Sequence, residues 1–126
     1  TRTAECCCGK SIVEVRSEPE FYGICNCHNC EKRTGSAFGL SAYFSERKFH
    51  VLSGSFVTYS LNAETVKQVR NFCSNCGTTL YWQTESLPTM VGVAGGCFVS
   101  KPLLEPQYSA QDEDRCPWVS FANSIG

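Results

Sequence analysis

The cysteines of this chain fall into short groups whose spacing suits metal binding. Seven of the ten cysteines in the 126-residue sequence lie in Cys6-x-Cys8, Cys25-x-Cys27-x-x-Cys30 and Cys73-x-x-Cys76. Disulfide frameworks usually place single cysteines far apart, so that each bond joins distant elements. Spacings of one or two residues instead direct two thiolates from one turn toward a shared ion. The spacing therefore predicts zinc sites rather than a disulfide scaffold.

The first predicted zinc site combines the two outer groups. Cys73 and Cys76 are followed by a glycine, which is typical of a zinc knuckle, and Cys6 and Cys8 are followed by a glycine as well. Four thiolates make a closed tetrahedral site, so this zinc is expected to be structural and to contribute to folding. Successive residues of an extended segment point to opposite sides, so Cys7 is expected to point away as a small buried residue.

The second predicted site has three thiolates, from Cys25, Cys27 and Cys30, and no fourth cysteine close in sequence. Three protein ligands and one exchangeable position are the pattern of a catalytic zinc. Two alternatives stay open. Either of the isolated cysteines, Cys97 or Cys116, would close the site with a fourth thiolate, and otherwise both are ordinary buried thiols. His28, between two of the cysteines, is the other candidate ligand.

An open zinc with three thiolates suits one kind of chemistry. Three anionic ligands make the ion a weak Lewis acid, so the site is expected to be a poor hydrolytic centre. Metal coordination still removes the proton of an incoming thiol, and the thiolate is the nucleophilic form. The sequence shows no Ser–His–Asp order, no GxGxxG and no Walker loop that would indicate another reaction. We therefore expect a reaction in which a substrate thiol is captured or activated.

The elements that must position these groups are expected to be mainly strands. The predicted strands span 11–16, 21–25, 37–44, 49–52, 56–61, 66–72, 78–83, 90–94 and 117–121. Ser-Gly-Ser at 53–55 predicts a hairpin between its two neighbouring strands, and CSNCG at 73–77 is the expected tip of another. Residues 28–34 are expected to form one helical turn, and 99–116 a surface loop. Many short strands separated by turns indicate an all-β domain.

Length and charge exclude several classes of protein. The chain has the size of one domain, taken as 1–126, and carries a net charge of −1 with a pI near 6.1. That balance gives no reason to expect a nucleic-acid partner. No apolar run approaches the roughly 18 residues that span a membrane, and TRTAECCCGK lacks a signal-peptide core. A cytoplasmic protein without a membrane partner is expected, and the sequence does not fix its oligomeric state.

The ordered motifs resemble the glutathione-dependent formaldehyde-activating enzyme family. The matching stretches are CCCG at 6–9, CNCHNC at 25–30, KRTGSAFG at 32–39, NFCSNCGTTLYW at 71–82 and RCPWV at 115–119. The resemblance implies a β-tent fold of small antiparallel coiled sheets pinned by zinc. It also implies a carbon–sulfur lyase that joins glutathione to formaldehyde, giving S-(hydroxymethyl)glutathione. The sequence departs from the family at Ser109, where many members carry histidine.

By this resemblance the two cysteine sets take different roles. The structural zinc falls on Cys6, Cys8, Cys73 and Cys76, and the zinc associated with catalysis falls on Cys25, Cys27 and Cys30. The partners implied are a small thiol such as glutathione and a small aldehyde. A non-catalytic module with two structural zincs is the alternative reading. A sulfoxide reductase is a third, and it would need a reactive cysteine away from the zinc sites.

Two basic residues after the second cysteine group are candidate substrate ligands. Lys32 and Arg33 are expected to bind the carboxylates of glutathione, unless they are a solvated surface pair. The aromatic residues are expected to be core, because aromatics dominate small β cores. Those considered were Phe38, Tyr43, Trp82 and Trp118.

Overall fold

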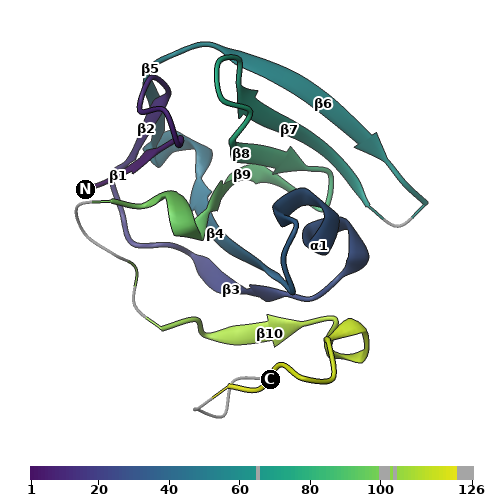
Figure 1. The fold of residues 1–126 in the computed structure, drawn as a ribbon. Helices are drawn as coiled ribbons and strands as arrows, with labels where there is room; N and C mark the ends of the chain where they lie inside the picture. Colours follow the sequence, from purple (N-terminus) through teal and green to yellow (C-terminus); the bar gives the residue numbers. More distant parts are fainter. Residues whose placement is uncertain (65, 100–102, 104, 122–126) are drawn as a thin grey trace.

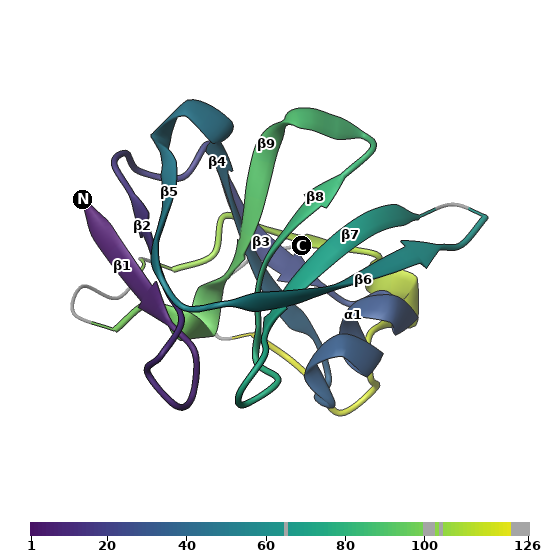
Figure 2. The same ribbon diagram turned by 90° about the horizontal axis from the view of Figure 1, so that it is seen from above.

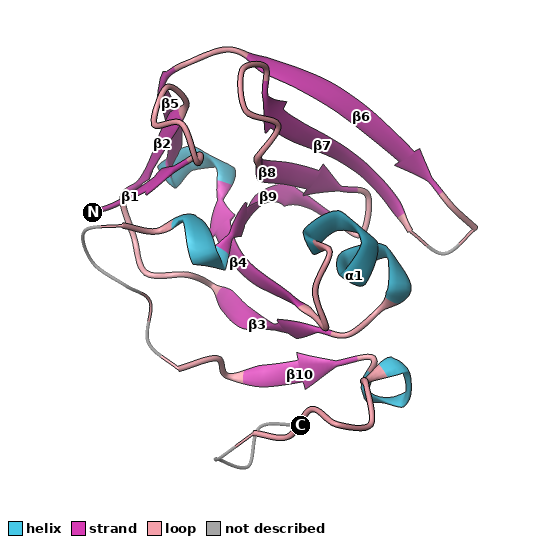
Figure 3. Cartoon of the chain, viewed as in Figure 1, coloured by secondary structure: helices cyan, strands magenta, loops and turns pink. Residues whose placement is uncertain are grey.

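The computed structural model describes residues 1–64, 66–99, 103 and 105–121, and it is mainly β (Figures 1 and 3). The strands are β1 Arg2–Glu5, β2 Ile12–Val15, β3 Phe21–Cys25, β4 Gly39–Ser45, β5 Phe49–Ser53, β6 Phe56–Asn62, β7 Lys67–Cys73, β8 Thr79–Thr84, β9 Leu87–Ala94 and β10 Tyr108–Ala110. The helices are α1 His28–Thr34 and the short 3₁₀ turns η1 Glu46–Lys48, η2 Gly95–Cys97 and η3 Asp112–Asp114. The predicted fold class, with antiparallel sheets and clustered cysteines, is confirmed.

Two sheets build the fold. The smaller has the order β1-β2-β5 and is antiparallel, and the larger has the order β10-β3-β4-β9-β8-β7-β6. Neighbours in the larger sheet are antiparallel except β10, which runs parallel to β3. Figure 1 shows its strands as an arc around α1, and Figure 2 gives the view from above. No helix among the described residues is long and apolar enough to cross a membrane.

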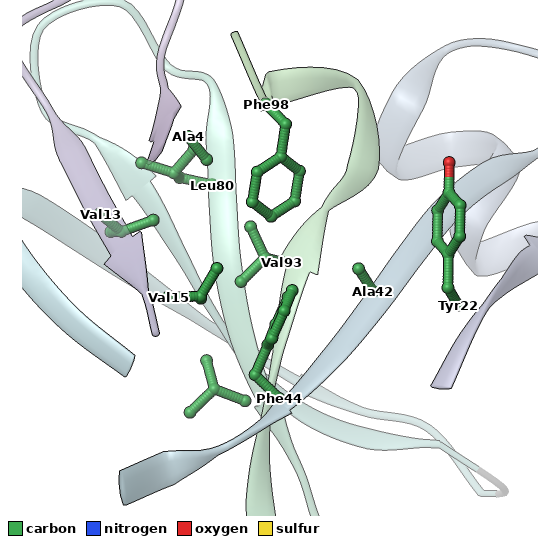
Figure 4. Close-up of a cluster of buried hydrophobic side chains, with 10 residues drawn as sticks. Ala4, Val13, Val15, Tyr22, Ala42, Phe44, Leu80, Val93 and Phe98 are labelled. Atoms are coloured by element: carbon green, nitrogen blue, oxygen red, sulfur yellow. The ribbon is translucent and has the colours of Figure 1, made fainter. Parts of the chain in front are cut away.

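The core lies where the two sheets meet, as Figure 4 shows. Alternation in β2 turns Val13 and Val15 inward, with 1% and 0% of their surface exposed. They face residues of β4, β8 and β9, among which Phe44 and Leu80 are fully buried. Phe44 also packs against Phe98 with ring centroids 5.9 Å apart. This core fixes β1 and β2 against the strands that carry the other cysteines.

Four features of the fold differ from the prediction. The hairpin predicted around Ser-Gly-Ser at 53–55 is wrong, because β5 pairs with β2 and β6 pairs with β7. Gly54 has φ +94° and its backbone lies against Ser11, so the turn carries the chain from one sheet to the other. The sequence prediction also did not include β1, which pairs with β2.

The C-terminal region corrects the other two predictions. The segment predicted as a loop holds β10 and η3, and residues 117–121, predicted as a strand, form none. A turn closed by the N–H of Val119 on the carbonyl of Cys116, at 2.9 Å, occupies this stretch. Trp118 is therefore 77% exposed and is not a core residue. Trp82 is buried as predicted, while Phe38 and Tyr43 are only partly buried.

Candidate functional site

The first cysteine group brings together two turns that are far apart in sequence. Cys6 and Cys8 come from the turn after β1. Cys73 is the last residue of β7, and Cys76 lies in the turn that leads to β8. All four sulfurs lie within 4.8 Å of one another, with 3.5 Å between Cys6 and Cys8 and 3.8 Å between Cys8 and Cys73. Tetrahedral zinc with Zn–S bonds of about 2.3 Å places sulfurs about 3.8 Å apart. The donor set therefore fits zinc.

Backbone groups of both turns support the sulfurs. The N–H of Ser11 donates to Sγ of Cys6 at 3.2 Å, and the N–H of Asn75 donates to Sγ of Cys73 at 3.4 Å. Gly77 has φ +81°, so it takes the left-handed conformation that a residue with a side chain disfavours. A hydrogen bond with the Thr78 side chain contributes most to lowering the pKa of Cys76 to about 5. These groups favour the thiolate state that a metal ligand needs, whereas burial raises the pKa of Cys6.

Cys7 lies between two members of this group and differs from them. Its side chain is outside the cluster and exposed, so the prediction of a buried residue is wrong. Its N–H donates to Oγ1 of Thr78 at 3.1 Å, which ties the two turns together through the backbone. Cys6 and Cys8 both point toward the cluster, so the side chain of Cys7 between them points into solvent.

The second cysteine group forms where β3 ends and α1 begins. Cys25 is the last residue of β3, Cys27 caps the N-terminus of α1, and Cys30 is buried in its first turn. The three sulfurs lie within 4.8 Å of one another. Sγ of Cys27 accepts from the N–H of Cys30 at 3.4 Å, so the cap holds the Cys27 sulfur beside the first turn that carries Cys30. Gly35, with φ +65°, ends the helix.

The thiols of this group interact strongly. A hydrogen bond with Cys30 contributes most to lowering the pKa of Cys25 to about 6, and the same contact followed by burial raises the pKa of Cys30. Burial raises the pKa of Cys27. Close thiols that share protons in this way are suited to a cation that replaces the protons, and softness of sulfur favours zinc.

Asn26, between two of these cysteines, is fully buried and joins the group to the C-terminal segment. Its Nδ2 donates to Oγ of Ser109 at 2.9 Å, to the carbonyl of Ala110 at 2.9 Å and to Oδ1 of Asp112 at 3.2 Å. Its N–H donates to the Ala110 carbonyl at 3.0 Å. Ser109 donates to the same Asp112 oxygen at 2.5 Å. The parallel strand β10 is thus part of the support of the cysteine turn.

The candidate fourth ligands lie outside the group of three in the part of the chain that the structure describes. His28 is exposed, with Nδ1 3.1 Å from Glu31 and Nε2 3.5 Å from Asp114. Cys116 places its sulfur 3.8 Å from Glu31. Cys97 packs against the core, and burial raises its pKa to about 11. The described residues thus bring together three thiols and no fourth cysteine or histidine.

A pocket of about 530 Å³ opens beside the second cysteine group, a size suited to a small-molecule ligand. Its wall includes all three cysteines, together with Arg70 of β7 and Trp82 of β8. Tyr108 also lines the pocket, with its ring so close to Gly23 that a Cβ there would clash with it. Thiols, aromatic rings and charged groups therefore share one space.

The two basic residues predicted to bind substrate lie differently. Arg33 lines the pocket, and its guanidinium carbon lies 4.3 Å from the centre of the Trp82 ring. Lys32 is exposed on α1 and is not part of the pocket wall. The sequence reasoning missed Arg70 and Lys67, which reach the pocket from β7. The pairing of β7 with β8 sets Arg70 opposite the pocket residue Trp82, a neighbourhood that the local sequence does not show.

Comparison with known proteins agrees with this arrangement. A family model described as "Glutathione-dependent formaldehyde-activating enzyme" matches residues 1–113. The chain belongs to the glutathione-dependent formaldehyde-activating enzyme family. Its match includes both cysteine groups, the pocket-lining strands and β10, and it ends next to Asp112.

A solved structure supports the fold of this family member. The crystal structure of a protein from Rhodobacter sphaeroides is similar with a TM-score of 0.63 and 24% identity, over 79% of this chain and 89% of that one. At that identity the likeness shows the fold alone. The comparison with curated proteins found no match.

Proposed function

We propose that the chain is a zinc-dependent carbon–sulfur lyase that forms and cleaves the adduct of glutathione, or a similar thiol, with formaldehyde or a related small electrophile. One observation carries the proposal. Three clustered cysteines, without a fourth cysteine or histidine among the described residues, face a pocket of about 530 Å³. Membership of the family, whose name states glutathione dependence and formaldehyde activation, supports the choice of substrates.

The proposed metal ligands form two sets. Cys6, Cys8, Cys73 and Cys76 would hold a closed structural zinc, whose binding energy stabilises the contact between the N-terminal turn and the β7–β8 turn. The second set, Cys25, Cys27 and Cys30, would hold the zinc associated with catalysis. When bound there, zinc supplies a positive centre that lowers the pKa of an incoming thiol.

The reaction itself is an addition to a carbonyl group. The thiol gives up its proton to solvent and its sulfur forms a bond to the carbon of formaldehyde. The carbonyl π bond breaks and the oxygen takes up a proton from water, so no proton is gained or lost overall. The three cysteines fix where the thiol arrives, and the pocket walls orient its remaining groups. Arg33, which lines the pocket, is proposed to bind a substrate carboxylate. For Lys32, exposed outside the wall, the same proposal requires a substrate that extends beyond the pocket.

The cysteines also bear on location. All ten are free, and several lie in pairs close enough to oxidise. A chain that needs thiols as metal ligands works best in a reducing compartment, which supports the proposal of a cytoplasmic enzyme.

The test is the rate of exchange between glutathione plus formaldehyde and their adduct, measured by magnetisation-transfer NMR. Zinc-loaded protein is expected to accelerate exchange above the uncatalysed rate. Cys27→Ser, which removes one thiol of the second group, is expected to abolish the acceleration. Cys7→Ser, an exposed cysteine outside both groups, is the matched control and should retain it. Exchange at the uncatalysed rate with intact zinc-loaded protein would overturn the proposal and favour a non-catalytic zinc module.

A further inference from the structure

Two guanidinium groups face the pocket without forming an ion pair among the described residues. Arg70 is only 9% exposed, and its hydrogen bonds go to neutral partners, from Nε to Gln68 at 3.1 Å and from Nη2 to the carbonyl of Asn29 at 3.5 Å. Arg33 has a buried Nη2 that makes no hydrogen bond with the described residues. Both side chains belong to the wall that also contains the three cysteines.

The position of Arg33 is fixed by its neighbours. Its guanidinium stacks on Trp82, which is itself held by a hydrogen bond from Nε1 to the hydroxyl of Tyr43 at 3.1 Å. A Cβ built on Gly39 would lie 2.6 Å from Nη2 of Arg33 and 3.3 Å from Cβ of Cys30, so the guanidinium lies beside the cysteine group. The absence of a side chain at this glycine leaves room for the arginine.

Buried cations in proteins are normally paired with anions, because an uncompensated charge is costly in a poorly hydrated site. Burial lowers the pKa of Arg70, and the nearby charge of Arg33 lowers it further, as expected for two cations on one wall. Neither Arg33 nor Arg70 has a carboxylate partner among the described residues, so an acidic group of a ligand would compensate them.

Three other charged residues line the pocket, and none of them forms an ion pair with Arg33 or Arg70 among the described residues. They are Glu64, Lys67 and Glu85, all of them exposed. Exposed charges are screened by water and contribute little at the depth of Arg70. The part of the pocket beside Arg33 and Arg70 therefore favours a ligand that brings its own negative charge.

We propose that Arg33 and Arg70 form a carboxylate-binding subsite, so that the protein selects thiols that carry a carboxylate over neutral thiols. The planar forks of two arginines suit the two oxygens of a carboxylate. The proposal rests on the function proposed above for the choice of thiols as ligands, but the subsite can be tested without any reaction. Glutathione carries two carboxylates, and the subsite requires one of them.

The test compares two ligands that cannot react, S-methylglutathione and its dimethyl ester, by calorimetric titration of the zinc-loaded full chain. Wild type is expected to bind the acid at least about tenfold more tightly than the ester, as charge-assisted hydrogen bonds require. Arg70→Gln is expected to reduce this ratio to about two or less. Arg33→Gln is expected to do the same and replaces Arg70→Gln if the latter fails to fold. Arg47→Gln, an exposed arginine of η1, is the matched control and should keep the ratio.

The outcomes separate the two proposals. Equal binding of acid and ester, an unchanged ratio in both variants, or no binding of either ligand would overturn the subsite. Preference for the acid without acceleration of the formaldehyde exchange would leave the subsite in place and remove the proposed reaction. Equal acceleration of the formaldehyde exchange for glutathione and its dimethyl ester would support the proposed reaction and overturn the subsite.

Discussion

The buried Asn26 gives the most specific prediction about how the second cysteine group is held. Asn26→Ala removes an amide whose two N–H groups reach Ser109, the carbonyl of Ala110 and Asp112, while the backbone bond to Ala110 remains. A hydrogen bond contributes about 0.5–1.5 kcal/mol net, so two lost donors correspond to about 1–3 kcal/mol of unfolding free energy. Asn26 is fully buried, so we expect a loss of unfolding free energy toward the upper end of that range.

The effect on the metal should be local. Partners that orient the ligands of a metal typically change its affinity by about 10–100-fold when they are removed. We therefore expect zinc to leave the second group at least about tenfold faster in Asn26→Ala, with release from the first group unchanged. Zinc release into a chromogenic chelator gives the two rates, and urea denaturation gives the unfolding free energy.

A matched control exists in the other cysteine turn. Asn75 also lies between two cysteines, but it is exposed, and its N–H bond to Cys73 survives substitution by alanine. Asn75→Ala is expected to change the unfolding free energy by less than about 0.5 kcal/mol. If Asn26→Ala behaves like Asn75→Ala in both assays, the link between β10 and the cysteine turn does not support the site.

Three further predictions concern the core, the thiols and the metal. Gly92→Ala should destabilise the fold by about 1–3 kcal/mol in thermal unfolding, because the new Cβ would clash with Nε1 of the buried Trp82. Gly96→Ala, whose Cβ would meet nothing within 4 Å, should be neutral. Burial raises the pKa of Cys97 to about 11, so only about one part in a thousand of this thiol should be thiolate at pH 8. Its rate of alkylation should therefore rise about tenfold per pH unit up to that pKa. Rapid alkylation of Cys97 at pH 8 would contradict this prediction and favour the sulfoxide reductase alternative. Chelation of zinc should lower the melting temperature more in wild type than in a variant that already lacks a cysteine of the first group, and equal shifts would count against a structural metal.

The cysteine groups were predictable from sequence because their geometry is local. Spacings of one and two residues determine which sulfurs can share a centre. The structure gathers the expected seven cysteines into one group of four and one group of three. The pairing of Cys6 and Cys8 with the distant turn at Cys73 followed from counting ligands rather than from any contact pattern. The short helix over residues 28–34 was also predictable, because the signals that limit it, including Gly35 at its C-terminus, lie next to it in the sequence.

The pocket and the sheet order were not predictable in the same way. Ser-Gly-Ser at 53–55 is compatible with a hairpin and with a crossing between sheets, and only packing against Ser11 decides between them. The three residues of β10 carry no alternation that would mark a strand. Arg70 reaches the pocket through a register with β8 that includes a bulge, which local sequence does not encode.

The central proposal is that the second cysteine group takes up the thiol of the substrate at an open metal position. Cadmium-113 NMR of the cadmium-loaded protein tests it most directly, because cadmium reports the number of bound sulfurs at each site. Two resonances are expected, and Cys27→Ser should perturb only one of them. We predict that glutathione shifts that same resonance and leaves the other in place. A spectrum in which saturating glutathione moves neither resonance, or moves the one unaffected by Cys27→Ser, would contradict the proposal.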